Sequence, residues 1–133
     1  MKCAKLFQNN LDSKKLKYRV ATTGDGDICV GFPYEGKNVQ MFFSGDEGEY
    51  MSMYTVFESV PKDKRFAVLE ACNELNCRYK WITFYLDKDN DIVLHRDAIL
   101  SVATADEEAF ELLIRNIRIM DEVKPVLMKA IYA

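Results

Sequence analysis

The sequence predicts an α+β domain, in which helices pack mainly on one side of an antiparallel sheet. Six short runs alternate apolar and polar residues and are bounded by Gly, Asn and Asp, a pattern typical of strands. Three other segments place apolar residues three and four apart, which is typical of amphipathic helices. The predicted order is helix, four strands, helix, two strands, helix. A chain of 133 residues suits a single domain over residues 1–133.

Composition narrows the classes of function. The chain is 49% apolar and 29% charged, with a formal net charge of -3. We therefore expect no nucleic-acid partner, because binding to phosphates needs clustered Lys and Arg. No apolar run approaches the roughly 20 residues of a membrane span, and the N-terminus lacks the apolar core of a signal peptide. We expect a cytoplasmic protein that does not contact membranes.

The first segment, residues 3–12, predicts a short amphipathic helix. Ala4, Phe7 and Leu11 fall at helical spacing, and the amide and hydroxyl side chains around them are typical of helix ends and surfaces. We expect this helix to lie on the surface of the sheet.

Four strands are predicted over residues 18–23, 28–34, 39–44 and 49–58. Glycine-containing turns separate them, and connections this short join neighbouring antiparallel strands, so a meander is expected. Pro33 cannot donate a ladder hydrogen bond, which predicts an edge or a bulge at the end of the second strand.

The second helix is predicted to begin with Pro61 at its first position, where the missing N–H needs no partner. Its end is predicted at Asn76 to Arg78. The apolar residues at helical spacing should form one stripe against the sheet; they are Phe66, Val68, Leu69, Cys72 and Leu75.

A hairpin of two strands should follow, with Asp87–Asp91 as its turn. A loop of residues 88–90, with Asn90 in the left-handed conformation, pairs Leu86 with Ile92 and Phe84 with Leu94. Side chains alternate between the two faces of a strand. That alternation places four residues together on the opposite face, namely Trp81, Tyr85, Val93 and His95.

The last helix is predicted to start at Thr104, where Thr104 and Glu107 match a capping box. Pro125 should kink or break this helix near Val123 and Lys124. An apolar stripe should cover the sheet; its members are Phe110, Leu113, Ile114, Ile117 and Met120.

We expect no catalytic residue, no cofactor site and no metal site. His95 is the only histidine, and a lone imidazole without a nearby nucleophile is more often a packing residue than a base. Asp87, Asp89 and Asp91 resemble the start of a calcium loop, but Ile92 stands where that loop needs glycine, so a plain turn is favoured. The cysteines form no CxxC pair. We expect buried or half-buried reduced thiols at Cys3, Cys29, Cys72 and Cys77.

The second face of the sheet is the more informative feature, because it is unusually apolar. Either a helix of the same chain covers it, or it is an exposed patch of the kind that marks a partner or dimer surface. The residues that we expect to bind a partner are Tyr50, Tyr54, Trp81, Tyr85, Val93 and His95.

The chain resembles the YbjN family of small bacterial proteins. The resemblance rests on a helix that ends at Leu75 and Asn76, the aromatic strand Lys80–Leu86, the acidic turn Asp87–Asp91 and a later helix that carries Pro125. It covers nearly the whole chain.

The resemblance implies a fold like that of type III secretion chaperones and a role as a sensory-transduction regulator. It implies a non-enzymatic protein that forms a homodimer and holds a protein or peptide partner, and it carries over no catalytic residue. The alternative is a small-molecule sensor or an enzyme, with a pocket between the last helix and the sheet.

Overall fold

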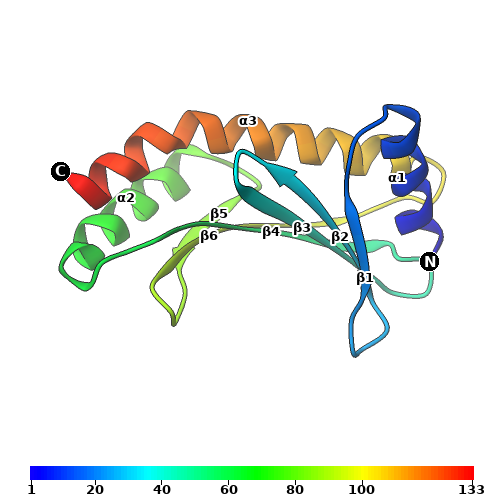
Figure 1. Cartoon of the computed structure of the whole chain (residues 1–133), viewed down its shortest axis with the longest axis horizontal. Helices are drawn as coiled ribbons and strands as arrows, with labels where there is room; N and C mark the ends of the chain where they lie inside the picture. Colours follow the sequence, from blue (N-terminus) through cyan, green and yellow to red (C-terminus); the bar gives the residue numbers. More distant parts are fainter.

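The computed structural model describes all 133 residues and shows one six-stranded antiparallel sheet with three helices on one side (Figure 1). The strand order across the sheet is β1-β2-β3-β4-β6-β5. The predicted fold class, order of elements and meander are therefore confirmed.

The elements have the following bounds. The helices are α1 (Lys2–Ser13), α2 (Arg65–Arg78) and α3 (Ala105–Tyr132), with a short 3₁₀ helix η1 (Lys62–Lys64) before α2. The strands are β1 (Arg19–Thr22), β2 (Ile28–Tyr34), β3 (Lys37–Ser44), β4 (Tyr50–Ser59), β5 (Thr83–Leu86) and β6 (Asp91–Ile99).

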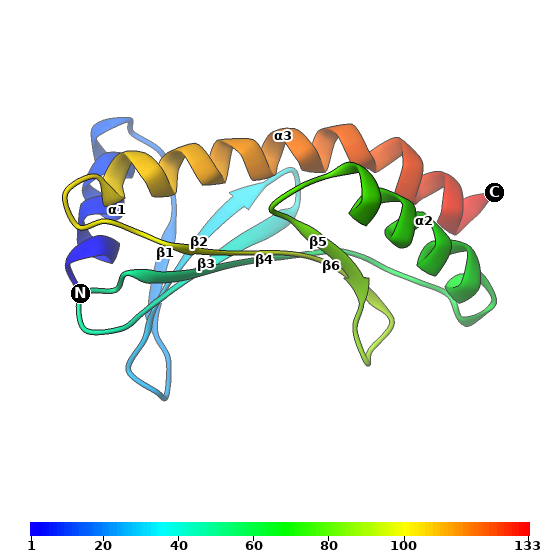
Figure 2. The ribbon, with the colours of Figure 1, turned by 180° about the vertical axis from the view of Figure 1, so that it is seen from behind.

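Helix α3 spans the length of the sheet and organises the core. It crosses over the middle strands, while α1 lies beside one of its ends and α2 beside the other (Figures 1 and 2). Alternate side chains of the strands, such as Met41, Met53 and Phe84, point to this side and are buried under the helices. One face of the sheet is thus given to the core.

The predicted register of the last hairpin is confirmed. Leu86 pairs with Ile92 and Phe84 with Leu94, and Asn90 has the left-handed φ of 60° that the loop requires. Pro33 lies beyond the last residue of β2 that pairs with β1, which is Gly31. Proline therefore occupies a position where no neighbouring strand needs its N–H.

The prediction for α2 was wrong in two respects. Pro61 is extended and precedes η1, so the α-helix begins at Arg65 rather than at the proline. The apolar stripe is also narrower than predicted, because Phe66 (75% exposed) and Leu69 point to solvent. Only the residues that face β5 and α3 are buried, and these are Val68, Cys72 and Leu75.

Helix α3 also departs from its prediction. It begins after Thr104 as expected, but the Thr104 hydroxyl donates to Glu108 and not to a backbone group, so there is no capping box with Glu107. The helix continues through Pro125 without a break. Packing on both sides of the proline, through Val123 and Leu127, outweighs its missing hydrogen bond.

The buried stripe of α3 is rotated relative to the predicted one. Ile114 is exposed, and Asn116 is buried in its place, where its amide contacts the Thr55 hydroxyl on β4 at 3.4 Å. A polar residue therefore lies in the centre of the core, and the apolar pattern alone could not identify it.

Trp81 lies outside the sheet, contrary to prediction. It has a φ of +73°, which is unfavourable for a bulky side chain, and β5 begins two residues later at Thr83. The chain thus turns away from β6 at Trp81, and the indole is 83% exposed.

Candidate protein-binding face

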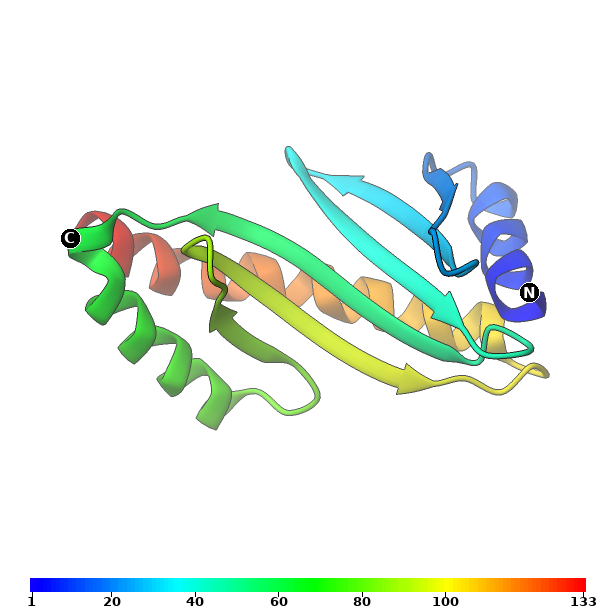
Figure 3. The same cartoon turned by 90° about the horizontal axis from the view of Figure 1, so that it is seen from below.

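The side of the sheet opposite the helices has no cover (Figure 3). We call this side the open face. The β1–β2 and β5–β6 hairpins project beyond it on the side away from α3 (Figure 1), so two hairpin turns flank the open face. Its side chains are the second members of each alternating strand pattern, which point away from the core.

An aromatic row crosses the open face over four strands. We use this name for Phe42 (β3), Tyr54 (β4), His95 (β6) and Tyr85 (β5). Phe42 and Tyr54 meet edge to face with ring centroids 5.8 Å apart, Tyr54 and His95 stack at 4.2 Å, and His95 meets Tyr85 edge to face at 6.4 Å. Each ring is half-buried, so the row is held in place by its own contacts and still presents ring surface to solvent.

Aliphatic side chains border the aromatic row. Val93 is buried between Val56 and Tyr85, with which it pairs across the strands. Val56 is 53% exposed, and at the other end of β4 the cross-strand pair Tyr50 and Ile99 is 54% and 76% exposed. Apolar side chains therefore recur along β4 and β6, on both sides of the polar cross-strand pair Ser52 and Asp97.

His95 is fixed by polar contacts as well as by stacking. Its Nε2 lies 2.7 Å from a carboxylate oxygen of Asp97, and Ser52 also donates to this carboxylate. Burial alone would raise the pKa of Asp97, but the hydrogen bonds from Ser52 and His95 outweigh it and leave the pKa below its ordinary value. Asp97 is therefore an anion at neutral pH.

Both hairpin turns beside the open face are acidic. Asp25 and Asp27 lie in the β1–β2 turn, and Asp87, Asp89 and Asp91 lie in or next to the β5–β6 turn. One Asp87 carboxylate oxygen accepts hydrogen bonds from the backbone N–H groups of Asp89 and Asp91, each at 2.9 Å. That carboxylate shapes the turn, as the prediction of a plain hairpin turn implies. No group of three or more His, Cys, Asp or Glu side chains has a metal-binding arrangement.

The structure brings together four of the six residues that the sequence predicts at the binding surface. Tyr54, Tyr85, Val93 and His95 are neighbours on β4, β6 and β5. Tyr50 lies on the same face but at the far end of β4, and Trp81 lies outside the sheet.

The sequence interpretation missed Phe42 and Ile99. Phe42 alternates with the buried Met41 and Phe43, so strand periodicity could have placed it on the open face. Ile99 continues the alternation of Val93, His95 and Asp97 to the end of β6.

The thiols contribute nothing to this surface beyond Cys29, which is half-buried and pairs with Phe42 across β2 and β3. All four cysteines are free. Cys77 is exposed, contrary to prediction, because it follows the buried Leu75 by two residues and so lies on the opposite side of α2. Burial raises the pKa of the Cys72 thiol to about 11.

A cavity between α3 and the sheet gives no support to a small-molecule site. It has a volume of about 20 Å³ and is lined in part by Tyr34, Phe57 and Met120. This volume is about that of one water molecule.

Comparison with known proteins places the chain in a family. The sequence model of the YbjN family, described as "Putative bacterial sensory transduction regulator", matches residues 5–122. The chain belongs to the YbjN family. No curated protein matches this YbjN sequence.

A solved structure has the same fold as this YbjN chain. It is the Yersinia pestis type III secretion chaperone SycH, crystallised in complex with a stable fragment of YscM2. The TM-score is 0.53 at 12% sequence identity, and the similarity covers 87% of the YbjN chain and 98% of the chaperone chain. The fold implied by the family resemblance is thus confirmed. None of the three helices has both the length and the apolar composition of a membrane span.

Proposed function

We propose that this YbjN protein is a non-enzymatic regulatory or chaperone-like protein that holds a segment of a partner polypeptide on its open face. The observation that supports this proposal best is the aromatic row on an uncovered sheet. Contiguous apolar surface of this kind is costly to expose to water and is typical of protein-binding sites. Preorganised rings also lose little side-chain entropy when a partner covers them.

The charge around the open face indicates the chemistry of the partner. The centre of the open face is apolar and aromatic, while the turns on either side carry Asp25, Asp27, Asp87 and Asp89. Opposite charge favours encounter and fixes the orientation of a bound segment. We therefore expect a partner segment with apolar residues in the middle and Lys or Arg toward its ends.

The family and fold comparisons agree with this role. The family is described as a regulator, and the chaperone with the same fold was crystallised with a protein fragment. A second copy of this chain is the competing occupant of the open face. The acidic turns of that copy would then approach the acidic turns beside the open face, which like-charge repulsion disfavours.

Site-specific crosslinking tests the proposal. A photoreactive phenylalanine analogue replaces Tyr54 on the open face or, as the control, Tyr132, which is exposed on the helix side. We expect one dominant crosslinked protein from position 54 and not from position 132, in the cells that make this YbjN protein.

The crosslinked protein is then purified and titrated against variants of the full chain. Tyr54→Ala and Tyr85→Ala should weaken its binding at least about tenfold, and Tyr132→Ala less than about twofold, because only the first two remove ring surface from the aromatic row. Equal binding by all three variants would contradict the proposal. So would a crosslink from position 54 only to a second copy of the chain.

A further inference from the structure

Half of one strand edge in the sheet is unpaired. β5 pairs with β6 only from Ile92 to His95, whereas β6 continues to Ile99. If β5 extended backward in register, Trp81 would pair with Asp97. The positive φ of Trp81 prevents this. The last residues of β6 therefore have a neighbour on the β4 side only (Figure 3).

The backbone groups that point out of this edge can be identified from the ladder. The Leu100 N–H donates to the Glu49 carbonyl on the β4 side, and the Asp91 carbonyl accepts from the Asp87 N–H on the β5 side. Successive residues of a strand direct their N–H and C=O to opposite sides. Asp97 and Ile99, which are both odd-numbered like Asp91, thus direct their N–H and C=O groups outward, where no strand lies.

The neighbouring edge, that of β5, is closed at Phe84. The Asn76 side chain on α2 donates to the Phe84 carbonyl at 2.9 Å and accepts from the Phe84 N–H at 2.7 Å. An amide side chain thus takes the place of a further strand. Protection of a sheet edge in this way prevents unwanted pairing, which makes the unprotected end of β6 more notable.

A buried cation without a counter-ion lies beside the free edge. Arg96 is on the core side of β6, is only 5% exposed, and its Nε has no hydrogen-bond partner. Burial and, to a lesser degree, the nearby Arg115 lower its pKa from the ordinary value. Arg115 itself is bound to Glu111 at 2.9 Å. A buried guanidinium of this kind is costly unless a carboxylate or carbonyl pairs with it.

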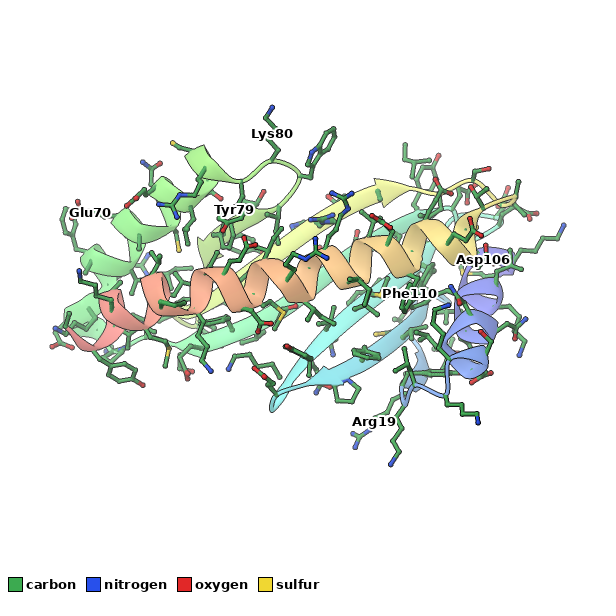
Figure 4. All side chains as sticks on the ribbon, turned by 90° about the horizontal axis from the view of Figure 1, so that it is seen from above. Arg19, Glu70, Tyr79, Lys80, Asp106 and Phe110 are labelled. Atoms are coloured by element: carbon green, nitrogen blue, oxygen red, sulfur yellow. The ribbon has the colours of Figure 1, made fainter.

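Residues 79–82 connect α2 to β5. In Figure 4, Tyr79 points from this connection toward α3, and Lys80 points away from the sheet. The Tyr79 hydroxyl donates to Glu122 on α3 at 2.8 Å. The carboxylate of Glu122 is thus already engaged by Tyr79, and the structure records no contact between it and Arg96.

We propose that the free edge of β6 receives an extended segment of a partner polypeptide as an added strand, with an Asp or Glu side chain that pairs with Arg96. The segment bonds to the outward backbone groups of Asp97 and Ile99. Its residues alternate between an acidic side chain on the helix side, opposite Arg96, and apolar or basic side chains on the open face, opposite Ile99 and Asp97. This inference rests on the proposed function and adds where and how the segment enters.

A second copy of the chain does not satisfy Arg96. If two β6 edges paired antiparallel, the residues that meet on the helix side would come from Leu94, Arg96, Ala98 and Leu100. None of them carries a carboxylate. An antiparallel pairing centred on Asp97 would also place the Asp97 carboxylates of the two copies opposite each other, which is destabilising. Charge complementarity therefore favours an acidic segment of a different polypeptide.

A peptide series tests this inference with the full chain. The probes are three capped nine-residue peptides of alternating Val and Thr that differ only in one central residue, which is Glu, Gln or Lys. Trp81 is the only tryptophan and lies where the added strand would begin, so its fluorescence reports binding. We expect the Glu peptide to bind about tenfold more tightly than the Gln peptide, as a charge-assisted hydrogen bond predicts, and the Lys peptide to bind most weakly.

Variants separate the side-chain contact from strand addition. Arg96→Gln should remove the preference for Glu over Gln. Ile99→Pro deletes an outward N–H that the protein's own sheet does not use, and it should weaken all three peptides at least about tenfold. Ile99→Thr, which keeps that N–H, should bind each peptide with an affinity within about threefold of the parent chain.

Hydrogen exchange tests strand addition without any variant. Exchange of the Asp97 and Ile99 amides should slow at least about tenfold with bound peptide, while exchange at Val20 on the far edge of the sheet stays unchanged.

Several results would overturn the inference. One is that no peptide binds, and another is that the Glu, Gln and Lys peptides bind with equal affinity. The others are unchanged amide exchange at Asp97 and Ile99 with bound peptide, and a dimer of the parent chain that Ile99→Pro converts to a monomer. If the partner crosslinked from position 54 binds Arg96→Gln and Ile99→Pro as tightly as the parent chain, the edge inference fails while the proposed function stands.

Discussion

At the scale of single residues, Asn76 determines where the sheet stops. Its side-chain amide makes the same pair of hydrogen bonds to Phe84 that a neighbouring strand would make. Because the amide belongs to α2, it also ties the end of this helix to β5. One residue thus closes an edge and positions a helix.

Asn76→Ala should destabilise the protein by about 1–2 kcal/mol, since it leaves a backbone donor and acceptor of Phe84 without partners. Urea denaturation measures this loss. Asn73→Ala, an exposed residue of the same helix without a recorded hydrogen bond, should change stability by less than about 0.5 kcal/mol. Equal effects of the two variants would show that the Asn76 bonds contribute nothing.

Arg96 leads to the opposite expectation. Replacement of an unpaired buried charge by an apolar residue of similar length is neutral or stabilising. Arg96→Met should leave the free energy of unfolding unchanged or raise it by about 1 kcal/mol, while it abolishes pairing with an acidic segment. Arg118→Met on the exposed side of α3 is the control in the same denaturation experiment. A clear loss of stability in Arg96→Met alone would mean that Arg96 stabilises the monomer.

At the scale of elements, α2 presents two different faces. Leu75 is fully buried against the sheet, and Leu69, less than two turns earlier, is exposed. Leu75→Ala should cost about 2–5 kcal/mol, as is usual for a buried leucine. Leu69→Ala should cost less than about 1 kcal/mol, because little apolar surface is re-exposed. Thermal or urea unfolding of the two variants gives the comparison, and similar losses would contradict this orientation of the helix.

The elements differ in how well the sequence predicts them. Strand periodicity places Met41, Met53 and Phe84 on the buried side and Tyr54 and His95 on the other, because a period of two leaves no choice of face. The sequence determines less well which face of each helix packs against the sheet. Apolar residues such as Phe66 and Ile114 widen the predicted stripe, and the local pattern does not show which part of it faces the sheet.

The candidate site also has one part that the local sequence predicts and another part that it does not. The members of the aromatic row on β4, β5 and β6 could be predicted from alternation and the turn at Asn90. The exposure of the row could not, because it depends on all three helices choosing one side. The free edge of β6 depends on the conformation of Trp81, and the buried position of Arg96 depends on the path of α3. Both are tertiary features without a signal in the local sequence.

At the scale of the whole molecule, the pKa of Cys72 makes stability depend on alkaline pH. The folded thiol has a pKa of about 11 against 9.0 for the free group, because it is buried. Its contribution to stability is complete below pH 9 and is lost as the pH rises toward 11, since the unfolded chain loses the proton first.

The free energy of unfolding, measured by urea denaturation, should therefore be about 2 kcal/mol lower at pH 10.5 than at pH 8.5 through this thiol alone. Burial also raises the pKa of Tyr79 and Tyr85, so part of the decline persists without Cys72. Cys72→Ala should make the decline shallower, and Cys77→Ala, which alters an exposed thiol, should not. An identical decline in both variants would contradict the assignment to Cys72.

The position of α3 in the chain also matters while the protein is being made. Every strand precedes this 28-residue helix. The ribosome therefore releases all six strands before the helix that covers the middle of their apolar side. At about 5–20 residues per second, translation of α3 takes roughly one to six seconds. During that interval only α1 and α2 can cover parts of the core side, so the middle of the sheet is open to water on both sides, and protection by a general chaperone would be most valuable then.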